Sequence, residues 1–351
     1  MLLLALLGCP KSAPVEPAFT WADTPRLPSP RSGTYASAVL RPEDPGVAEV
    51  MGDRAWDASL AGAAAGVGLH LVDHVGGLTS PEVREAAWSA GWPYPIGRAE
   101  AWPVPIGAPP SAAVSAWLEK QPAEAHIGLV RVRGSGRDLW VGLASTVRAD
   151  LGIQPRQLPV GGQLVLPTVP GARATIADPV GHLFAGELHT TWSLTTDLAG
   201  EWLVEVRDDA GPIAVFPVYV GIVPPELGLL VPSQPPGDAA EAVRIADQRL
   251  IEVRDAYGLR ALESDPLLEA AARRVLADPS VTVEQLAPAA GLPAEHVWKM
   301  GCVGSTVESC LDAILWDVRS RTGLLAEHAL VGRVAEVGPT TVHLVLVVGA
   351  E

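Results

Sequence analysis

Asp57-Ala58-Ser59-Leu60-Ala61-Gly62-Ala63-Ala64 and Asp265-Pro266-Leu267-Leu268-Glu269-Ala270-Ala271-Ala272 carry an Asp, a Leu and an Ala pair at the same offsets. Leu and Ala at this spacing predict an amphipathic helix in each stretch. An Asp directly before such a helix is a natural N-cap. The two stretches therefore predict one structural unit that occurs twice in the chain.

Further landmarks follow in the same order in both copies. Ala90-Gly91-Trp92-Pro93 corresponds to Ala290-Gly291-Leu292-Pro293, and Trp117 and Trp316 then follow at nearly equal distances. Each copy ends in two β-rich runs, which span 127–133 and 139–144 in the first copy and 329–337 and 341–348 in the second. A repeat of this length predicts an Ala-rich helix, a second helix, a third helix with a Trp and a terminal hairpin in each copy.

A different module separates the copies. Short runs with strand character alternate with turn signals such as Val169-Pro170-Gly171 and Asp208-Asp209-Ala210-Gly211. Regular short strands with such turns predict a β-sandwich. The segment from Leu198 to Val206 resembles the late hairpin of bacterial immunoglobulin-like domains.

Composition excludes some partners. The 351 residues are 48% hydrophobic and 19% charged, which is enough apolar sequence for two or three folded domains. Acidic residues outnumber basic ones 40 to 25, for a net charge of −15. Nucleic-acid binding requires clustered Lys and Arg, so we expect no nucleic-acid partner.

The N-terminal run Met1-Leu2-Leu3-Leu4-Ala5-Leu6-Leu7-Gly8-Cys9 resembles a bacterial lipoprotein signal. The resemblance implies cleavage before Cys9, acylation of Cys9 and a membrane partner through the acyl chains. It also implies a location in the cell envelope, on the outer membrane or cell surface. The apolar run is short and no Lys or Arg precedes it, and the alternative is an unprocessed N-terminal segment. The Pro-rich residues that follow predict an extended tether.

The start of the second copy resembles the CAP family of cysteine-rich secretory, antigen 5 and pathogenesis-related proteins. The resemblance rests on Arg254-Asp255-Ala256-Tyr257-Gly258-Leu259-Arg260-Ala261-Leu262 and the Asp-capped helix after it, and on Trp56-Asp57-Ala58-Ser59-Leu60-Ala61 in the first copy. It implies an α/β/α sandwich around a small antiparallel sheet. The expected fold class is therefore α+β, with two CAP-like α/β/α sandwiches and an all-β sandwich between them.

These observations divide the chain as follows: a lipoprotein signal over 1–8, a tether over 9–40, a divergent CAP-like domain over 41–148, an immunoglobulin-like β-sandwich over 149–222, a Pro-rich linker over 223–237 and a second CAP-like domain over 238–351.

The resemblance also implies a cleft with two His and two acidic residues that can hold a divalent metal. In the first copy, His74, Glu100 and His126 lie near the matching positions, while the equivalent offsets in the second copy give Thr282 and Met300. Independently of the family, His70 and His74 are four residues apart on an expected helix and share a face. The candidate metal ligands are thus His70, His74, Glu100 and His126, with His74 and Glu100 as catalytic candidates. The alternative is that these are ordinary surface side chains and that no cofactor is bound.

Cys302 and Cys310 are eight positions apart and would pair in an oxidising compartment. The alternative is two buried thiols.

Trp88, Trp92, Tyr94 and Trp102 cluster around a Pro-rich stretch of the first copy. Such a cluster fits either a groove for a glycan, peptide, lipid or protein ligand or the core of a small domain.

The second copy lacks the polar residues of the family's cleft and the first retains only some of them. We therefore expect a non-enzymatic binding or scaffold protein of the cell envelope. The alternative is a metal-assisted hydrolase that uses a residual cleft in the first copy.

Overall fold

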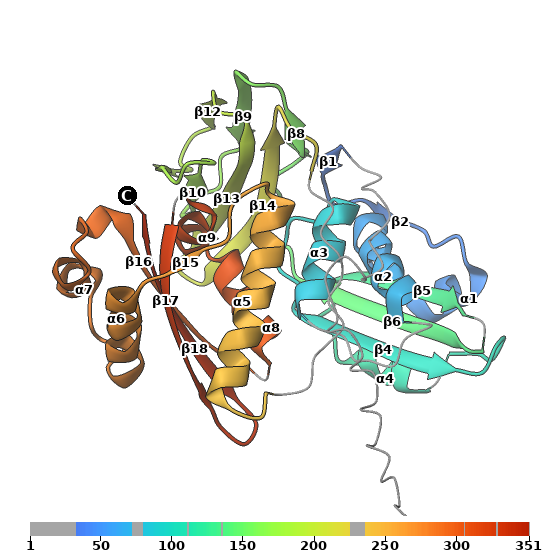
Figure 1. Ribbon diagram of the computed structural model, residues 1–351. Helices are drawn as coiled ribbons and strands as arrows, with labels where there is room; N and C mark the ends of the chain where they lie inside the picture. Colours follow the sequence, from blue (N-terminus) through green and yellow to red (C-terminus); the bar gives the residue numbers. More distant parts are fainter. Residues whose placement is uncertain are drawn as a thin grey trace, which may run out of the picture.

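The computed structural model describes residues 33–71, 80–110, 112–134, 136–224, 236–304, 306–327 and 329–350. It shows an α+β protein in which a β-rich middle unit lies between two units that contain both helices and sheets (Figure 1). We refer to residues 36–145 as the first unit, 146–224 as the middle unit and 236–350 as the last unit.

A five-stranded mixed sheet forms the centre of the first unit. Its strand order is β2-β3-β5-β6-β4, with bounds Val39–Leu40, Trp56–Asp57, His126–Arg133, Asp138–Ser145 and Arg98–Val104. The helices α2 (Ala58–Leu71) and α3 (Ser80–Ala90) pack on one face, and α1 (Pro45–Met51) and α4 (Ala112–Glu119) pack on the other. The unit is therefore an α/β/α sandwich with an apolar core on each side of its sheet.

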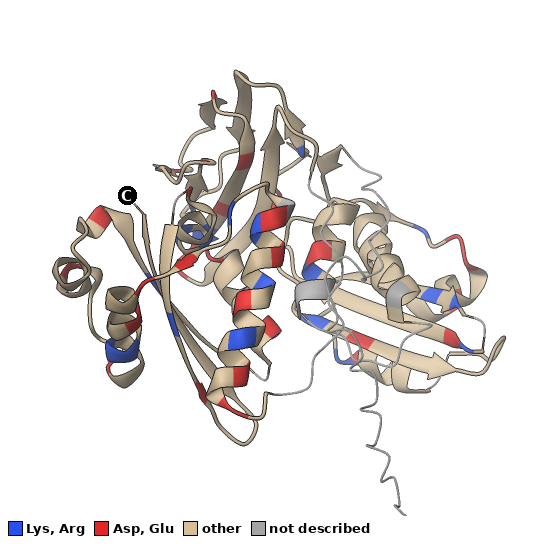
Figure 2. Cartoon of the chain, viewed as in Figure 1, with Lys and Arg blue, Asp and Glu red and all other residues tan. Residues whose placement is uncertain are grey.

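The last unit is built around the sheet β15-β17-β18-β16, with bounds Glu263–Ser264, Ala329–Val337, Val342–Ala350 and Val297–Gly304. One face carries α6 (Pro266–Ala277) and α7 (Val283–Ala290), with the short η2 (Ala294–His296) after α7. The other carries α5 (Ala239–Ala256) and α8 (Val307–Trp316), followed by α9 (Val318–Leu325). Figure 2 shows acidic and basic residues along α5, which buries Ala242, Ala246 and Leu250 against the sheet.

The two outer units share one topology. The strands β3-β5-β6-β4 of the first unit and β15-β17-β18-β16 of the last unit lie in the same spatial order relative to their order along the chain. The register agrees as well, because Trp56 pairs with Ile127 in parallel and Ser264 pairs with Val331 in parallel. The repeat in the sequence is therefore a repeat of the backbone plan.

The end of the second helix shows the same agreement in detail. Gly91 and Gly291 both adopt left-handed conformations, with φ of 85° and 70°. The next amide then donates back into the helix, from Trp92 to the Ala87 carbonyl and from Leu292 to the Ala287 carbonyl. Glycine suits this position because a Cβ is unfavourable at positive φ.

The middle unit consists of two mainly antiparallel layers and a short strand pair. The larger sheet has the order β11-β10-β13-β14-β8, with bounds Leu183–Glu187, Arg173–Ala177, Gly200–Asp208, Gly211–Val220 and Gln157–Leu158. The strands β9 (Gly162–Leu166) and β12 (Trp192–Thr196) form the second layer. Buried side chains from both layers, Leu164, Ile176, Trp202 and Phe216 among them, fill one core.

The predicted tether over 9–40 extends too far toward the C-terminus. β1 (Thr34–Tyr35) pairs with β7 (Gln154–Pro155), and β2 joins the first sheet. Tyr35 is fully buried, and its hydroxyl donates to the Pro217 carbonyl oxygen at 2.8 Å. Aromatic burial of this kind fixes residues 34–40 in the fold, while residues 9–32 lie outside the described residues.

The units are joined in two different ways. Between the first and middle units one apolar core is continuous, and the Trp88 indole Nε1 donates to the Val215 carbonyl at 2.8 Å. Between the middle and last units, Val318 of α9 joins the same core, and a buried polar group is added: Arg321 Nε lies 2.6 Å from Glu201 Oε1, and the Tyr257 hydroxyl donates to Glu201 Oε2 at 2.5 Å. The helices α3 and α8 also contact each other, so all three units meet in one region.

Among the described residues, none of the helices combines the length and the apolar character needed to cross a bilayer.

Candidate functional site

A buried polar cluster lies at the start of β5 in the first unit. The Ser37 hydroxyl donates to Asp57 Oδ2 at 2.7 Å and lies 3.2 Å from His126 Nδ1, which is itself 3.4 Å from Asp57 Oδ2. The His126 ring also packs on Trp92, with centroids 5.7 Å apart. Asp57 is fully buried and His126 is partly exposed.

Asp57 is a structural residue in this cluster. Its Oδ1 accepts from the amides of Ser59 and Leu60 at the start of α2, and its Oδ2 accepts from the Ala38 amide at 2.7 Å. These bonds satisfy a buried carboxylate and cap the helix. Ser37 and Asp57 both face the same ring nitrogen of His126, whereas a serine nucleophile requires the two groups on opposite ring nitrogens. The cluster therefore does not form a Ser-His-Asp triad.

Glu100 and His126 do not share a site. Glu100 on β4 pairs with Gly142, which pairs with Leu129, and these positions face α4. His126 lies three positions from Leu129 along β5, so the pleat turns it to the opposite face, toward α2. The predicted metal set of Glu100 with His126 is therefore wrong, because the sheet separates the two side chains.

The remaining metal candidates are not brought together by the described structure. His70 belongs to α2, but its side chain lies outside the described residues, as does the whole of His74. In the ranges that the structure describes, no group of three His, Cys, Asp or Glu side chains has the geometry to hold a metal ion.

The four aromatic residues separate into two places. Trp88, Trp92 and Tyr94 are buried in the core shared by the first and middle units, and Trp92 and Tyr94 are in edge contact at 5.1 Å. Trp102 projects to the other face of the sheet and packs on Trp117 of α4. A single groove lined by all four is therefore excluded.

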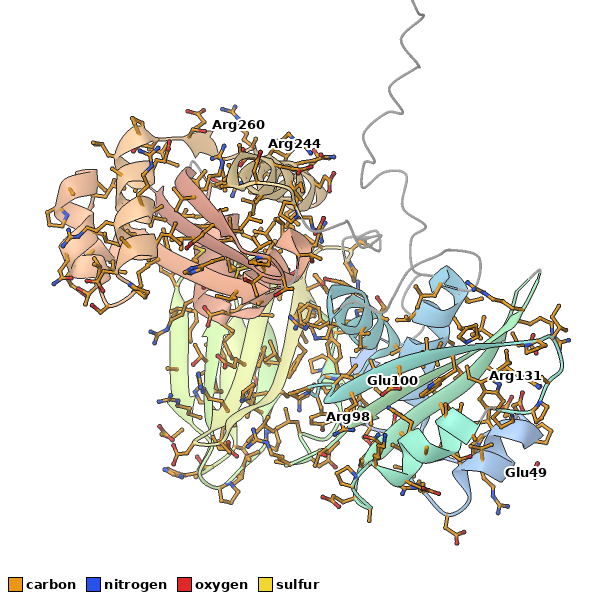
Figure 3. The ribbon with its side chains drawn as sticks, turned by 90° about the horizontal axis from the view of Figure 1, so that it is seen from below. Glu49, Arg98, Glu100, Arg131, Arg244 and Arg260 are labelled. Atoms are coloured by element: carbon orange, nitrogen blue, oxygen red, sulfur yellow. A yellow bond between two sulfur atoms is a disulfide. The ribbon has the colours of Figure 1, made fainter. Side chains whose placement is uncertain are left out.

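The first three aromatic residues nevertheless line a cavity of about 620 Å³ where the three units meet. Its walls are α3, the segment from Trp92 to Ala99, the β13–β14 hairpin, and the α8–α9 corner at Ala313 and Asp317. A volume in this range is typical of pockets for small molecules. Figure 3 shows Arg98, one of the lining residues, at the end of β4 near the middle unit, and Arg131 at the opposite end of the sheet.

The cavity wall is held in place by its neighbours. The Tyr94 hydroxyl donates to Asp150 Oδ1 at 3.3 Å and accepts from the Leu151 amide, and burial raises the pKa of Tyr94 to about 12. The phenol therefore stays protonated at neutral pH and retains both bonds. Trp88 is likewise held by the bond from its indole Nε1 to the Val215 carbonyl.

Charged side chains around the cavity are dominated by arginine. The lining contains Arg84, Arg98 and Arg207 against Glu205 and Asp317. Asp317 already accepts from the Ser320 amide and hydroxyl at the start of α9. Desolvation raises the pKa of Glu205, although Arg207 Nη1 lies 3.6 Å from its carboxylate and opposes the shift.

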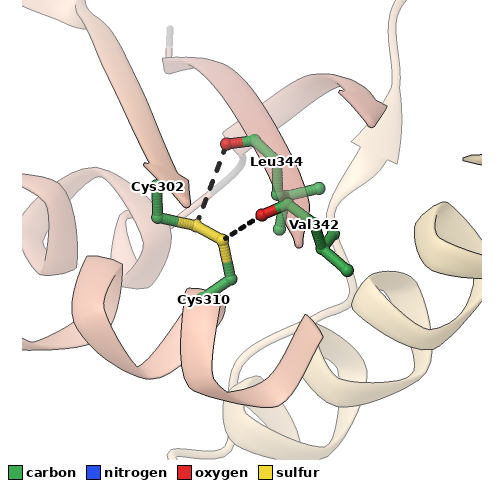
Figure 4. The surroundings of a disulfide bond; sticks show 4 residues. All are labelled: Cys302, Cys310, Val342 and Leu344. Atoms are coloured by element: carbon green, nitrogen blue, oxygen red, sulfur yellow. Dashed lines mark hydrogen bonds between the residues drawn. A yellow bond between two sulfur atoms is a disulfide. The ribbon is translucent and has the colours of Figure 1, made fainter. Parts of the chain in front are cut away.

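A disulfide joins Cys302 of β16 to Cys310 of α8, with 5.3 Å between the Cα atoms. Its sulfur atoms lie 3.9 Å from the backbone oxygens of Leu344 and Val342 on β18 (Figure 4). The bond ties the start of α8 to its sheet. Cys9 lies outside the described residues.

Sequence reasoning missed Ser37, Arg98, Arg207 and Asp317 as site residues. Ser37 falls within the predicted tether, and the other three belong to three different units. No local motif connects such residues, so only the contacts between units in the folded chain reveal them.

No protein-family model matches the chain, and no curated protein matches it. A solved structure with some similarity is that of a cysteine-rich secretory protein from Staphylococcus aureus subsp. aureus Mu50. It is 11% identical, with a TM-score of 0.25, over 78% of this chain and 91% of the other.

Proposed function

We propose that this protein is a non-enzymatic binding protein of the bacterial cell envelope, anchored through an acylated Cys9, with CAP-like outer units. The observation that carries the proposal is the cavity where the three units meet. Its walls come from α3, the β13–β14 hairpin and the α8–α9 corner, so the ligand site depends on the assembled chain.

The first unit supports binding better than metal-assisted hydrolysis. Glu100 is exposed on one face of the sheet, and His126 is held on the other beside Asp57. In the last unit, Met300 has the register position of Glu100, since it pairs with Leu346 as Glu100 pairs with Gly142. Met300 is buried in the apolar core.

The anchor is tested by fractionation of cells that express the full chain. Cys9→Ala is expected to move the protein from the membrane fraction to the soluble fraction, because two or more acyl chains are needed for stable anchoring. Mass spectrometry of the wild-type N-terminus checks for the acylated cysteine. Unchanged fractionation and an unmodified N-terminus would refute the anchor.

The binding role is tested by filling the cavity. Ala313 is exposed on α8 and lines the cavity, so Ala313→Trp introduces a large side chain into it. Ala240→Trp is the matched control, because Ala240 is exposed on α5 and outside the lining. Native mass spectrometry of protein extracted from its own envelope is expected to detect a small-molecule adduct in wild type and Ala240→Trp, and not in Ala313→Trp. The same spectrum for all three proteins would contradict the binding role.

A further inference from the structure

We propose that one end of the middle unit lies on the surface of the bilayer and orients the anchored protein there. This end consists of four loops, at residues 159–161, 178–182, 197–199 and 221–223, which we call the apolar end. The inference rests on the proposed function, because the acyl chains of Cys9 bring the folded chain to the membrane. It adds the face of the protein that meets the lipid.

The loops of the apolar end expose large hydrophobic side chains. Val160, Val180 and Val223 are 54%, 59% and 83% exposed, and Leu198 and Ile222 are exposed as well. Single exposed hydrophobic residues are common on soluble surfaces, whereas several gathered in one patch mark an interaction surface. The adjacency of the loops therefore decides whether these side chains act together.

Close contacts place the four loops side by side. A Cβ on Gly221 would lie 2.7 Å from Val160 Cγ2 and 3.6 Å from the Ala199 Cβ, so the fourth loop touches the first and the third. A Cβ on Gly200, which follows the third loop, would lie 2.6 Å from the Pro179 Cβ of the second. The loops therefore form one contiguous surface at the end of the β-sandwich.

The two ends of the middle unit differ in charge. The loops of the apolar end contain no Lys or Arg, and of their two carboxylates Asp178 is buried and Asp197 is exposed. At the other end of β13 and β14, Asp209 is exposed in the turn and Asp208 pairs with Arg148 at 2.6 Å. Charged side chains are costly to move from water into lipid, so a bilayer can cover the apolar end more readily.

The apolar end is also positioned to meet a flat surface. Figure 1 shows β8 and β9, which the first loop connects, at the top of the view, above both outer units. The strand β12, which precedes the third loop, lies there as well. A bilayer can contact a surface at the extremity of a molecule without a clash with the remaining units.

The chain enters the fold beside this end. The carbonyl of Gly33, the first described residue, accepts from the Arg156 amide at 2.9 Å, and the Arg156 carbonyl accepts from the Tyr219 amide. Val160 lies four positions after Arg156, and Val223 lies four positions after Tyr219. At the rise of a β-strand, Gly33 is therefore within about 20 Å of the exposed valines.

The acylated Cys9 keeps this entry point near the bilayer. Residues 10–32 connect Cys9 to Gly33, and a chain of that length spans at most about 80 Å. A surface tethered near its target meets it at a high effective concentration, so modest apolar contacts are enough to orient the protein. The net charge of −15 opposes anionic headgroups, which favours a zwitterionic lipid surface as the occupant.

The test places a fluorophore at either end of the middle unit in the acylated full chain. Val160→Cys and Ala210→Cys each introduce one thiol for a nitrobenzoxadiazole dye, since Cys9 is acylated in the proposed form and Cys302 and Cys310 form the disulfide. Ala210 is exposed in the β13–β14 turn and is the matched control for the dye itself.

The dye at position 160 is expected to report lipid contact. On phosphatidylcholine vesicles its fluorescence should rise about threefold and be quenched by a nitroxide-labelled phosphatidylcholine, while the dye at position 210 should not change. Val223→Asp, added to the Val160→Cys protein, should reduce this quenching about fivefold, because a carboxylate opposes entry into lipid. Val303→Asp is the charge-matched control, since Val303 is 66% exposed in the last unit. Circular dichroism checks that every variant folds.

The outcomes separate the docking surface from the anchor. Equal quenching at positions 160 and 210 would overturn the docking of the apolar end, while sedimentation with vesicles that depends on Cys9 would still support the anchor. Quenching at position 160 that Val223→Asp and Val303→Asp leave equally unchanged would also overturn it, because the apolar side chains would then not be what meets the lipid. Failure of the acylated wild type to sediment with vesicles would refute the anchor and the docking together.

Discussion

The first and last units share their backbone plan and differ in what their side chains do. In the first unit, Asp57 caps α2 and also holds Ser37 near His126. In the last unit, Asp265 makes the equivalent cap through a bond from the Leu268 amide at 2.8 Å. In the last unit, Leu330 has the register position of His126. The last unit therefore keeps the helix cap but lacks the polar cluster.

The same contrast holds next to the second helix. Ser145 in the first unit donates to the Pro95 carbonyl at 2.6 Å. Its counterpart Gly349 has no side chain, and a Cβ there would lie 2.3 Å from Leu292 Cδ1. Leu292 therefore fills the space that the first unit uses for polar contacts. Both units thus share the helix caps and the close contacts between helix and strand. The positions around these features are polar in one unit and apolar in the other.

The largest expected effect tests a close contact that both outer units share, in which a strand glycine packs against the backbone of a helix. A methyl at Gly332 would lie 1.9 Å from the Leu268 carbonyl carbon, and one at Gly128 would lie 2.4 Å from that of Leu60. Backbone cannot yield as a flexible side chain does, so we expect Gly332→Ala to cost about 4 kcal/mol and Gly128→Ala about 3 kcal/mol. Hydrogen exchange of the strand and helix in each unit measures the local opening free energy.

Gly301→Ala is the control for these variants. Gly301 lies in the same sheet as Gly332, but the nearest atom to its added Cβ is 3.8 Å away. A loss of less than about 1 kcal/mol is expected. If Gly332→Ala costs no more stability than Gly301→Ala, the close contact between helix and strand does not fix the repeated topology.

The next effect separates the two caps. Asp57→Ala leaves the amides of Ala38, Ser59 and Leu60 without their acceptor, and it also frees Ser37. We expect it to cost about 3 kcal/mol, against about 1 kcal/mol for Asp265→Ala, which removes one capping bond. Denaturant unfolding followed by circular dichroism measures both. Losses that agree within about 0.5 kcal/mol would show that the polar cluster adds nothing to the cap.

The smallest effect concerns the cavity, to which the two outer units contribute opposite charges. Desolvation raises the pKa of Glu205, whose charged neighbours are Arg207, Asp317, Arg173 and Arg319. Protonation as pH falls removes a negative charge from the cavity, while the arginines stay charged. We therefore expect the contribution of Glu205 to the free energy of unfolding to increase as pH falls through its raised pKa.

A raised pKa means that the folded state holds the proton more strongly, so the contribution of Glu205 to stability decreases as pH rises through that pKa. Glu205→Gln should abolish this change, which denaturant unfolding at several pH values measures. A pH dependence that persists in Glu205→Gln would assign the titration to another group.

The residues of the repeat could be predicted because their signals are local. In both copies the N-cap Asp precedes a core Leu by three positions, and a Gly directly follows the last turn of the second helix. Both patterns span only a few residues, so they can be recognised in the sequence. The middle unit has the short strands and turns that the sequence predicts, for the same reason, since alternation and turn residues act over a few positions. The site could be predicted only in part: Trp88, Trp92 and Tyr94 do line a cavity, whereas Glu100 and His126 were grouped although a sheet divides them.

The sequence by itself determined the elements, their caps and the order in which both copies use them, because hydrogen bonds and periodicity of this kind act within one or two helical turns. Only the tertiary structure decided which face of the pleat each side chain takes and which distant residues meet. Arg98, Arg207 and Asp317 come from three units and meet at one cavity, since packing of apolar faces brings together segments that no local pattern connects.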